Sequence, residues 1–145
     1  MLRQLAFGGG ISLINIAIHS LVMATLVRIA QLAAAKPMPH PSLHLAGVMI
    51  PIVSVLMATH ALEVVVWSIA YGFVDAAPEE ADLVYFAFVN YATLGYGDIV
   101  PLERWRLLGP ITAMNGVLLF GWSTAVIFDV LRRTMERGTP TNAKD

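Results

Sequence analysis

The chain has 145 residues, of which 57% are hydrophobic and 13% are charged, and its formal net charge is −1. Soluble domains carry roughly a quarter charged residues, so this composition excludes an ordinary soluble protein and is typical of an integral membrane protein. No basic cluster points to a nucleic-acid partner, and the absence of cysteine excludes disulfides, thiolate catalysis and zinc sites built on cysteine.

Three apolar segments are long enough to cross a bilayer, which takes about 20 mostly apolar residues. We expect transmembrane helices at residues 11–34, 45–73 and 107–131. A Gly-Gly-Gly run at residues 8–10 is expected to break the chain before the first of them.

The first apolar segment has an alternative interpretation as a signal peptide. Arg3 gives it a positive start, and the small residues 33–35 resemble a cleavage site. The segment is too long for that role, and Asn15, His19 and Arg28 interrupt it. We therefore expect a retained helix.

The connections between these segments differ in character. Residues 36–41 are rich in proline and cannot continue a helix. Residues 75–80 form an acidic loop, followed by an apolar stretch at 83–92 that is too short to span and predicts a re-entrant half-helix. Pro78 suits the first position of that helix.

Basic residues near the helix ends predict the orientation. They gather at the first loop and after the third span, at Arg28, Lys36, Arg132, Arg133 and Arg137. Those ends are expected in the cytoplasm, with the N-terminus and the acidic loop outside. Arg104 and Arg106 are exceptions to this pattern.

Residues 93–98, Thr-Leu-Gly-Tyr-Gly-Asp, follow the half-helix. Carbonyl oxygens replace the water around a cation only if they point at one axis, which requires left-handed conformations at alternate residues. Glycine adopts these without a Cβ penalty, and Gly95 and Gly97 alternate accordingly. Thr93 adds a hydroxyl, and the half-helix directs its negative end at the same point.

Residues 90–98 resemble the pore loop of the potassium channel superfamily. The likeness covers about residues 56–133 and includes Pro101, Trp105, Gly116 and the Phe-Gly pair at 120–121. It implies a homotetramer in the bacterial inner (plasma) membrane, with K⁺ as the permeant ion and no cofactor.

The resemblance also implies roles for single residues. K⁺ would bind at Thr93, Leu94, Gly95 and Tyr96, with Gly97 completing the selectivity filter and Asp98 at its outer mouth. Gly116 would be the hinge of the inner helix, and Val117, Phe120 and Thr124 would line the cavity.

Several residues depart from the pattern of the superfamily. Leu94 replaces a valine and Ala92 a threonine, which makes a weakly selective cation channel the alternative. Val89 replaces an acid, so Asp98 is expected to lack that partner, and Tyr-Phe at 85–86 replaces two tryptophans.

Polar residues inside the expected spans are the remaining candidates. His60 and Glu63 form an intramembrane polar pair, interpreted as packing or as a proton- or metal-sensitive element. Glu63 is expected to be paired with His60, or with His19 or Arg28; zinc needs more ligands than His60 and Glu63 supply.

Two further polar features lie on the first and third spans. Ser12, Asn15 and His19 form a stripe that is expected to meet another helix, and Asn115 faces either the cavity or a neighbouring helix.

The sequence thus predicts an all-α membrane protein with three transmembrane helices, a re-entrant pore helix and a tetrameric pore. Its parts are an N-terminal helix and loop (1–44), a pore domain (45–133) and a short cytoplasmic tail (134–145). The predicted function is a potassium-selective channel. A non-conducting accessory protein is a further alternative, and no feature indicates an enzyme.

Overall fold

The computed structural model describes residues 1–34 and 40–138, so the predictions for residues 36–39 and 139–145 lie outside the described part of the chain. The described residues form helices joined by turns, without strands. The elements in chain order are α1 (Leu2–Ala34), α2 (Pro41–Phe73), α3 (Leu83–Tyr91), the 3-10 helix η1 (Glu103–Trp105) and α4 (Leu108–Gly138).

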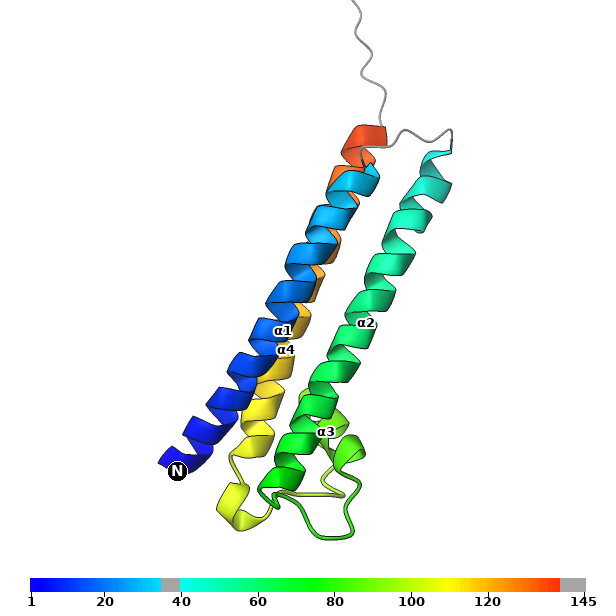
Figure 1. The fold of residues 1–145 in the computed structure, drawn as a ribbon. Coiled ribbons are helices and arrows are strands. Elements are labelled where there is room, and N and C mark those ends of the chain that lie inside the picture. The colour runs from blue at the N-terminus through cyan, green and yellow to red at the C-terminus, as the bar shows by residue number, and fades with distance from the viewer. Residues whose placement is uncertain (35–39, 139–145) are drawn as a thin grey trace, which may run out of the picture.

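The three long helices run side by side, and the short helix α3 packs against α2 and α4 at one end of the molecule (Figure 1). The N-terminus, the loop after α2 and the segment between α3 and α4 lie at this end. The end of α1, the start of α2 and the end of α4 lie at the other end. Among the basic residues used to predict orientation, Arg28 near the end of α1 and Arg132, Arg133 and Arg137 near the end of α4 therefore share one end of the molecule, and Lys36 lies outside the described residues.

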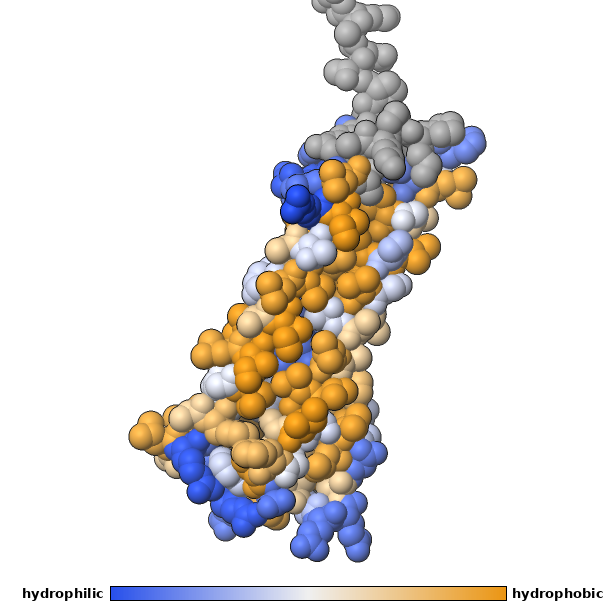
Figure 2. Space-filling model, viewed as in Figure 1, coloured by the Kyte–Doolittle hydropathy of each residue, from blue (hydrophilic) through white to orange (hydrophobic). Residues whose placement is uncertain are grey.

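Three helical segments are long and apolar enough to cross a membrane: Leu2–Leu32, Ser42–Phe73 and Glu103–Glu136. This confirms the three predicted spans, although all three helices are longer than expected. Apolar side chains cover most of the length of the visible face, and hydrophilic residues gather towards both ends (Figure 2). The fold is that of an all-helical integral membrane protein.

The expected break at residues 8–10 is wrong, because these glycines lie inside α1. Gly8 is buried against α4, where an added Cβ would lie 2.9 Å from Cδ1 of Ile111 and 3.1 Å from Cδ2 of Leu108. A Cβ at Gly9 or Gly10 would meet nothing within 4 Å. Gly8 thus permits a close approach of two helices rather than ending one.

The interior has two apolar clusters separated by a polar layer. The first, at the α3 end, is dominated by aromatic side chains: Trp67, Tyr71, Phe86, Tyr91 and Trp105. The second, towards the other end, is aliphatic: Met23, Leu26, Ile52, Leu56 and Val126. Between them lie the fully buried side chains of Asn15, His19 and Glu63.

The start of α3 is fixed by Asp82, not by Pro78 as predicted. The Asp82 carboxylate accepts hydrogen bonds from the backbone N–H groups of Val84 (3.0 Å) and Tyr85 (3.1 Å). Pro78 lies earlier, in a turn in which its carbonyl accepts from the N–H of Ala81 at 3.0 Å. Aspartate is among the strongest N-cap residues because its oxygens satisfy N–H groups that have no partner in the helix.

The first helix is also tied to the segment that precedes α4. The side-chain oxygen of Gln4 accepts a hydrogen bond from the N–H of Leu107 at 2.9 Å. The Arg3 guanidinium lies 4.4 Å from the ring centre of Trp105, within the range of a cation–π contact. α1 is therefore an integral part of the packed fold.

Candidate ion pathway and buried polar cluster

The segment at residues 93–98 begins directly at the C-terminal end of α3. The N–H of Thr93 bonds to the carbonyl of Asn90 at 3.0 Å, and the N–H of Leu94 bonds to that of Val89 at 2.9 Å. These bonds turn the chain sharply out of the helix. They also place the negative end of the α3 dipole beside the start of this segment.

Every second residue of this segment has a left-handed backbone. The φ angles are +60° at Thr93, +59° at Gly95 and +78° at Gly97. The predicted conformations of both glycines are confirmed, and Thr93 adds a third position that was not predicted. A β-branched residue rarely adopts positive φ, and such strain tends to cluster at functional sites.

Residues 93–98 are exposed on the single chain, although most of them are not charged. The exposed fraction is 52% for Leu94 and 66% for Tyr96. At membrane depth, irregular backbone is tolerated only when it is buried in protein or lines a water-filled cavity. This segment therefore needs further protein or water around it.

Asp98 has a partner other than the acid that Val89 replaces. The Tyr85 hydroxyl donates to the Asp98 carboxylate at 2.6 Å, and the N–H of Ile99 donates to its other oxygen at 3.1 Å. The Tyr85 hydrogen bond holds the pKa of Asp98 below its ordinary value and raises the pKa of Tyr85. The contact joins the start of α3 to the end of the irregular segment.

Gly116 is where α4 meets the end of α3. A Cβ atom at this position would collide with the carbonyl oxygen of Tyr91 and would lie 3.0 Å from its carbonyl carbon. α4 continues as a helix through this point. The hinge role expected for Gly116 stays a prediction, and the structure gives this glycine a packing role of its own.

The residues expected to line a cavity are exposed on α4. Val117 is 55% exposed and Phe120 39%, and the exposed Thr124 hydroxyl bonds to the carbonyl of Phe120 at 2.9 Å. Asn115 is buried instead and accepts hydrogen bonds from Trp67 (3.0 Å) and from Asn15 on α1 (3.2 Å). Asn115 thus faces neighbouring helices.

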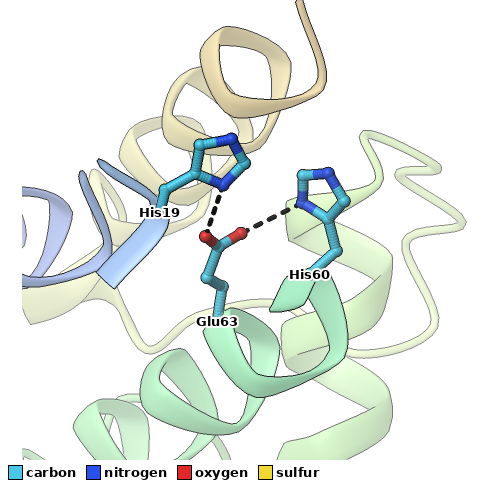
Figure 3. A group of neighbouring side chains, drawn as sticks. All are labelled: His19, His60 and Glu63. Atoms are coloured by element: carbon cyan, nitrogen blue, oxygen red, sulfur yellow. Dashed lines mark hydrogen bonds and ion pairs between the residues drawn. The ribbon is translucent and has the colours of Figure 1, made fainter. Parts of the chain in front are cut away.

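A buried polar cluster joins α1, α2 and α3. Glu63 is fully buried, and its carboxylate oxygens lie 2.8 Å from Nδ1 of His19 and 3.0 Å from Nδ1 of His60 (Figure 3). The Tyr91 hydroxyl donates to the same carboxylate. The predicted pairing of Glu63 is confirmed. Its partners among the described residues are the two histidines and the tyrosine, and Arg28 is exposed on α1.

Three residues that bond to the predicted site residues were not predicted as their partners: Tyr85, Tyr91 and Ser123. Tyr85 and Tyr91 were available as hydroxyl donors on the short helix, but their partners depend on how the chain folds back. The Ser123 hydroxyl lies 2.9 Å from Nε2 of His60. An isolated serine in an apolar helix gives no signal of such a contact.

A comparison with known protein families agrees with this arrangement of helices. Two long helices flanking a short helix and an irregular segment define an integral membrane protein with a channel-type domain. The model of a family described as "Ion channel" matches residues 55–133, which is more than half of the chain. The chain belongs to this family, the two-transmembrane-helix ion channel domain of the potassium channel superfamily. Neither a curated protein nor a solved structure matches the chain.

Proposed function

We propose that the protein is a potassium-selective channel in which four copies of the chain surround one pore. Residues 93–97 of each copy would form the selectivity filter, with K⁺ held by the carbonyl oxygens of Thr93, Leu94, Gly95 and Tyr96 and by the Thr93 hydroxyl. Asp98 would stand at the outer mouth. Conduction would be passive and would need no cofactor.

The observation that carries this proposal is the alternation of left-handed residues at 93, 95 and 97 in a member of an ion channel family. Alternate left-handed residues turn successive carbonyl groups towards one side, as a cation site made of backbone oxygens requires. Potassium channels are the known case of such a filter, in which carbonyl oxygens replace the hydration shell of the ion. The same mechanism is proposed for residues 93–97.

The tetramer is supported by the exposure of residues 93–98 in the single chain. Four copies around an axis would cover this segment with protein and leave its carbonyl groups facing the ion path. The exposed faces at Val117, Phe120 and Thr124 would then line the cavity below the filter.

The orientation follows from the charges at the two ends of the molecule. Arg132 and Arg133 follow the most apolar part of α4 and lie at the end opposite to the filter. Cytoplasmic loops carry an excess of basic residues, which supports an orientation with this end inside, and the filter would then open to the outside of a bacterial plasma membrane.

Flux through liposomes tests the proposal. Protein reconstituted into vesicles should release K⁺ down its gradient far faster than Na⁺, and Gly95→Asp should abolish the flux. Native mass spectrometry of the same preparation should show four chains. A monomer or dimer without flux would favour the accessory role instead.

A weakly selective cation channel is the second candidate, and Leu94 favours it. This side chain is bulkier than the valine of the superfamily pattern and stands behind a ring of carbonyl groups. Comparable K⁺ and Na⁺ fluxes, both lost in Gly95→Asp, would establish this candidate.

A further inference from the structure

We propose that His19, His60, Glu63 and Tyr91 form a binding site for Zn²⁺ at the place where α1, α2 and α3 meet. Sequence reasoning set zinc aside because His60 and Glu63 supply too few ligands. The fold brings His19 to the same carboxylate from a helix 44 residues away in the chain. The inference is independent of ion conduction, because metal binding is measured without any flux.

The donor atoms already converge on a small volume. One ligand atom from each of His19, His60 and Glu63 can be chosen so that all lie within 4.8 Å of one another. Around a tetrahedral zinc ion with bonds of about 2.0–2.1 Å, neighbouring ligand atoms stand roughly 3.3 Å apart. Small side-chain rotations would therefore suffice to enclose the ion (Figure 3).

The second ring nitrogen of each histidine, Nε2, has a hydrogen-bond partner, as is usual for histidines that bind a metal. Nε2 of His60 lies 2.9 Å and Nε2 of His19 lies 3.4 Å from the Ser123 hydroxyl oxygen of α4. A hydroxyl has two acceptor lone pairs, so Ser123 can receive both N–H groups. Histidines that bind metal through one nitrogen almost always donate the other N–H to such a partner. With both Nε2–H groups on Ser123, the two Nδ1 atoms would bind the ion in place of their present contacts with Glu63.

Tyr91 supplies the fourth ligand and completes the charge balance. Its hydroxyl oxygen lies 3.0 Å from Nδ1 of His60 and bonds to Glu63. A zinc ion bound by two neutral histidines, the Glu63 carboxylate and the Tyr91 phenolate has no net charge. The phenol proton passes to solvent on binding, so no net charge is left in an interior where uncompensated charge is costly.

The surroundings are those of an enclosed site. The exposed fraction of the side chain is 0% for His19 and Glu63 and 12% for His60. The Phe120 ring lies 4.5 Å from that of His60, and the Trp122 ring lies 5.3 Å from that of His19. Within the described residues, the ion pairs of Glu63 are with these two histidines. A bound ion would lock α1 onto the channel-type domain.

Metal titration of the purified full chain tests the proposal. The protein, freed of any affinity tag and stripped with a chelator, is titrated in detergent with ZnCl₂ and, separately, with CoCl₂. We expect one Zn²⁺ per chain, a higher unfolding temperature with Zn²⁺, and the intense visible absorption of four-coordinate Co²⁺. Absence of binding to the wild-type chain overturns the proposal and leaves a hydrogen-bonded cluster without metal.

Matched variants assign the ligands. His19→Gln, His60→Gln and Glu63→Gln should each weaken Zn²⁺ binding by at least about a hundredfold, since loss of a residue that merely hydrogen-bonds to a ligand already costs about 10–100-fold. Tyr91→Phe removes the fourth ligand, so it should weaken binding by a similar factor, at least about a hundredfold, and alter the Co²⁺ spectrum. His44→Ala, on α2 outside the cluster, should bind as the wild type does.

The pattern across the variants decides the outcome. Unchanged affinity in any of the four ligand variants overturns the site as proposed. Equal loss in His44→Ala would show that binding is not specific to the cluster and would overturn it too. If one glutamine variant does not fold, the Co²⁺ spectrum of the wild type and the remaining variants still decide.

Discussion

The carbonyl oxygen of Tyr91 lies so close to the α carbon of Gly116 that no Cβ atom fits between them. The last residue of α3 is thereby seated directly on the backbone of α4. Residues 93–98 follow within two residues, so this contact sets the position of the proposed filter relative to the helix proposed to line the pore.

Replacing this glycine tests the contact. Gly116→Ala should destabilise the fold by about 1–3 kcal/mol or more, because the obstacle is backbone and cannot move aside as a side chain can. Gly121→Ala is the matched control, since a Cβ there meets nothing within 4 Å. Thermal unfolding in detergent measures both, and equal stability of the two variants would contradict the packing role.

The Tyr85–Asp98 hydrogen bond makes a prediction about pH. The bond favours the ionised carboxylate, so the pKa of Asp98 is lowered and should return towards its ordinary value in Tyr85→Phe. The stabilisation is present above the ordinary pKa and is lost as the pH falls through the lowered one. Carboxyl ¹³C NMR of labelled aspartate measures the shift, with Asp129 as a reference within the sample. An unchanged Asp98 titration would refute the hydrogen bond.

The packing of α1 on α4 is tested at neighbouring glycines. In Gly8→Ala the new methyl group would press on Ile111 and Leu108, whereas Gly10→Ala adds a methyl group at an exposed position. Alanine otherwise favours a helix over glycine, so Gly10→Ala should be neutral or stabilising. We expect Gly8→Ala to be less stable than Gly10→Ala by about 1 kcal/mol. Equal unfolding temperatures would show that α1 does not approach α4 as described.

Hydropathy predicted the helices well because a long apolar segment has few alternatives in a membrane. The pattern does not tell how helices rotate against one another. For this reason the sequence placed His60 and Glu63 on one face but left the partner open among three residues, of which His19 and His60 proved correct.

The errors share a physical origin, since each local pattern had two valid uses. Glycines at 8–10 are compatible with the end of a helix and also with a close contact between two helices. The sequence alone does not show that α4 packs against Gly8. Pro78 and Asp82 both suit the start of a helix, and the bonds at Asp82 depend on the path of the loop. The bond between Tyr85 and Asp98 was not predicted at all, because it too depends on how the chain folds back.

A substitution at Gly95 tests whether the proposed filter needs its left-handed backbone. An L-residue in this conformation costs roughly 1–2 kcal/mol, although a Cβ there meets nothing within 4 Å of the same chain. Gly95→Ala should therefore remain folded, with K⁺ flux in liposomes reduced at least about tenfold. Gly10→Ala should conduct as the wild type does. Full flux in Gly95→Ala would argue against a pathway through residues 93–97.

The reversal potential of single channels with K⁺ on one side of a planar bilayer and Na⁺ on the other tests the central proposal most directly. A potassium-selective filter predicts a reversal potential far from zero, with the sign set by K⁺, and loss of the current in Gly95→Asp. A reversal potential near zero, or a current that persists in Gly95→Asp, would contradict it.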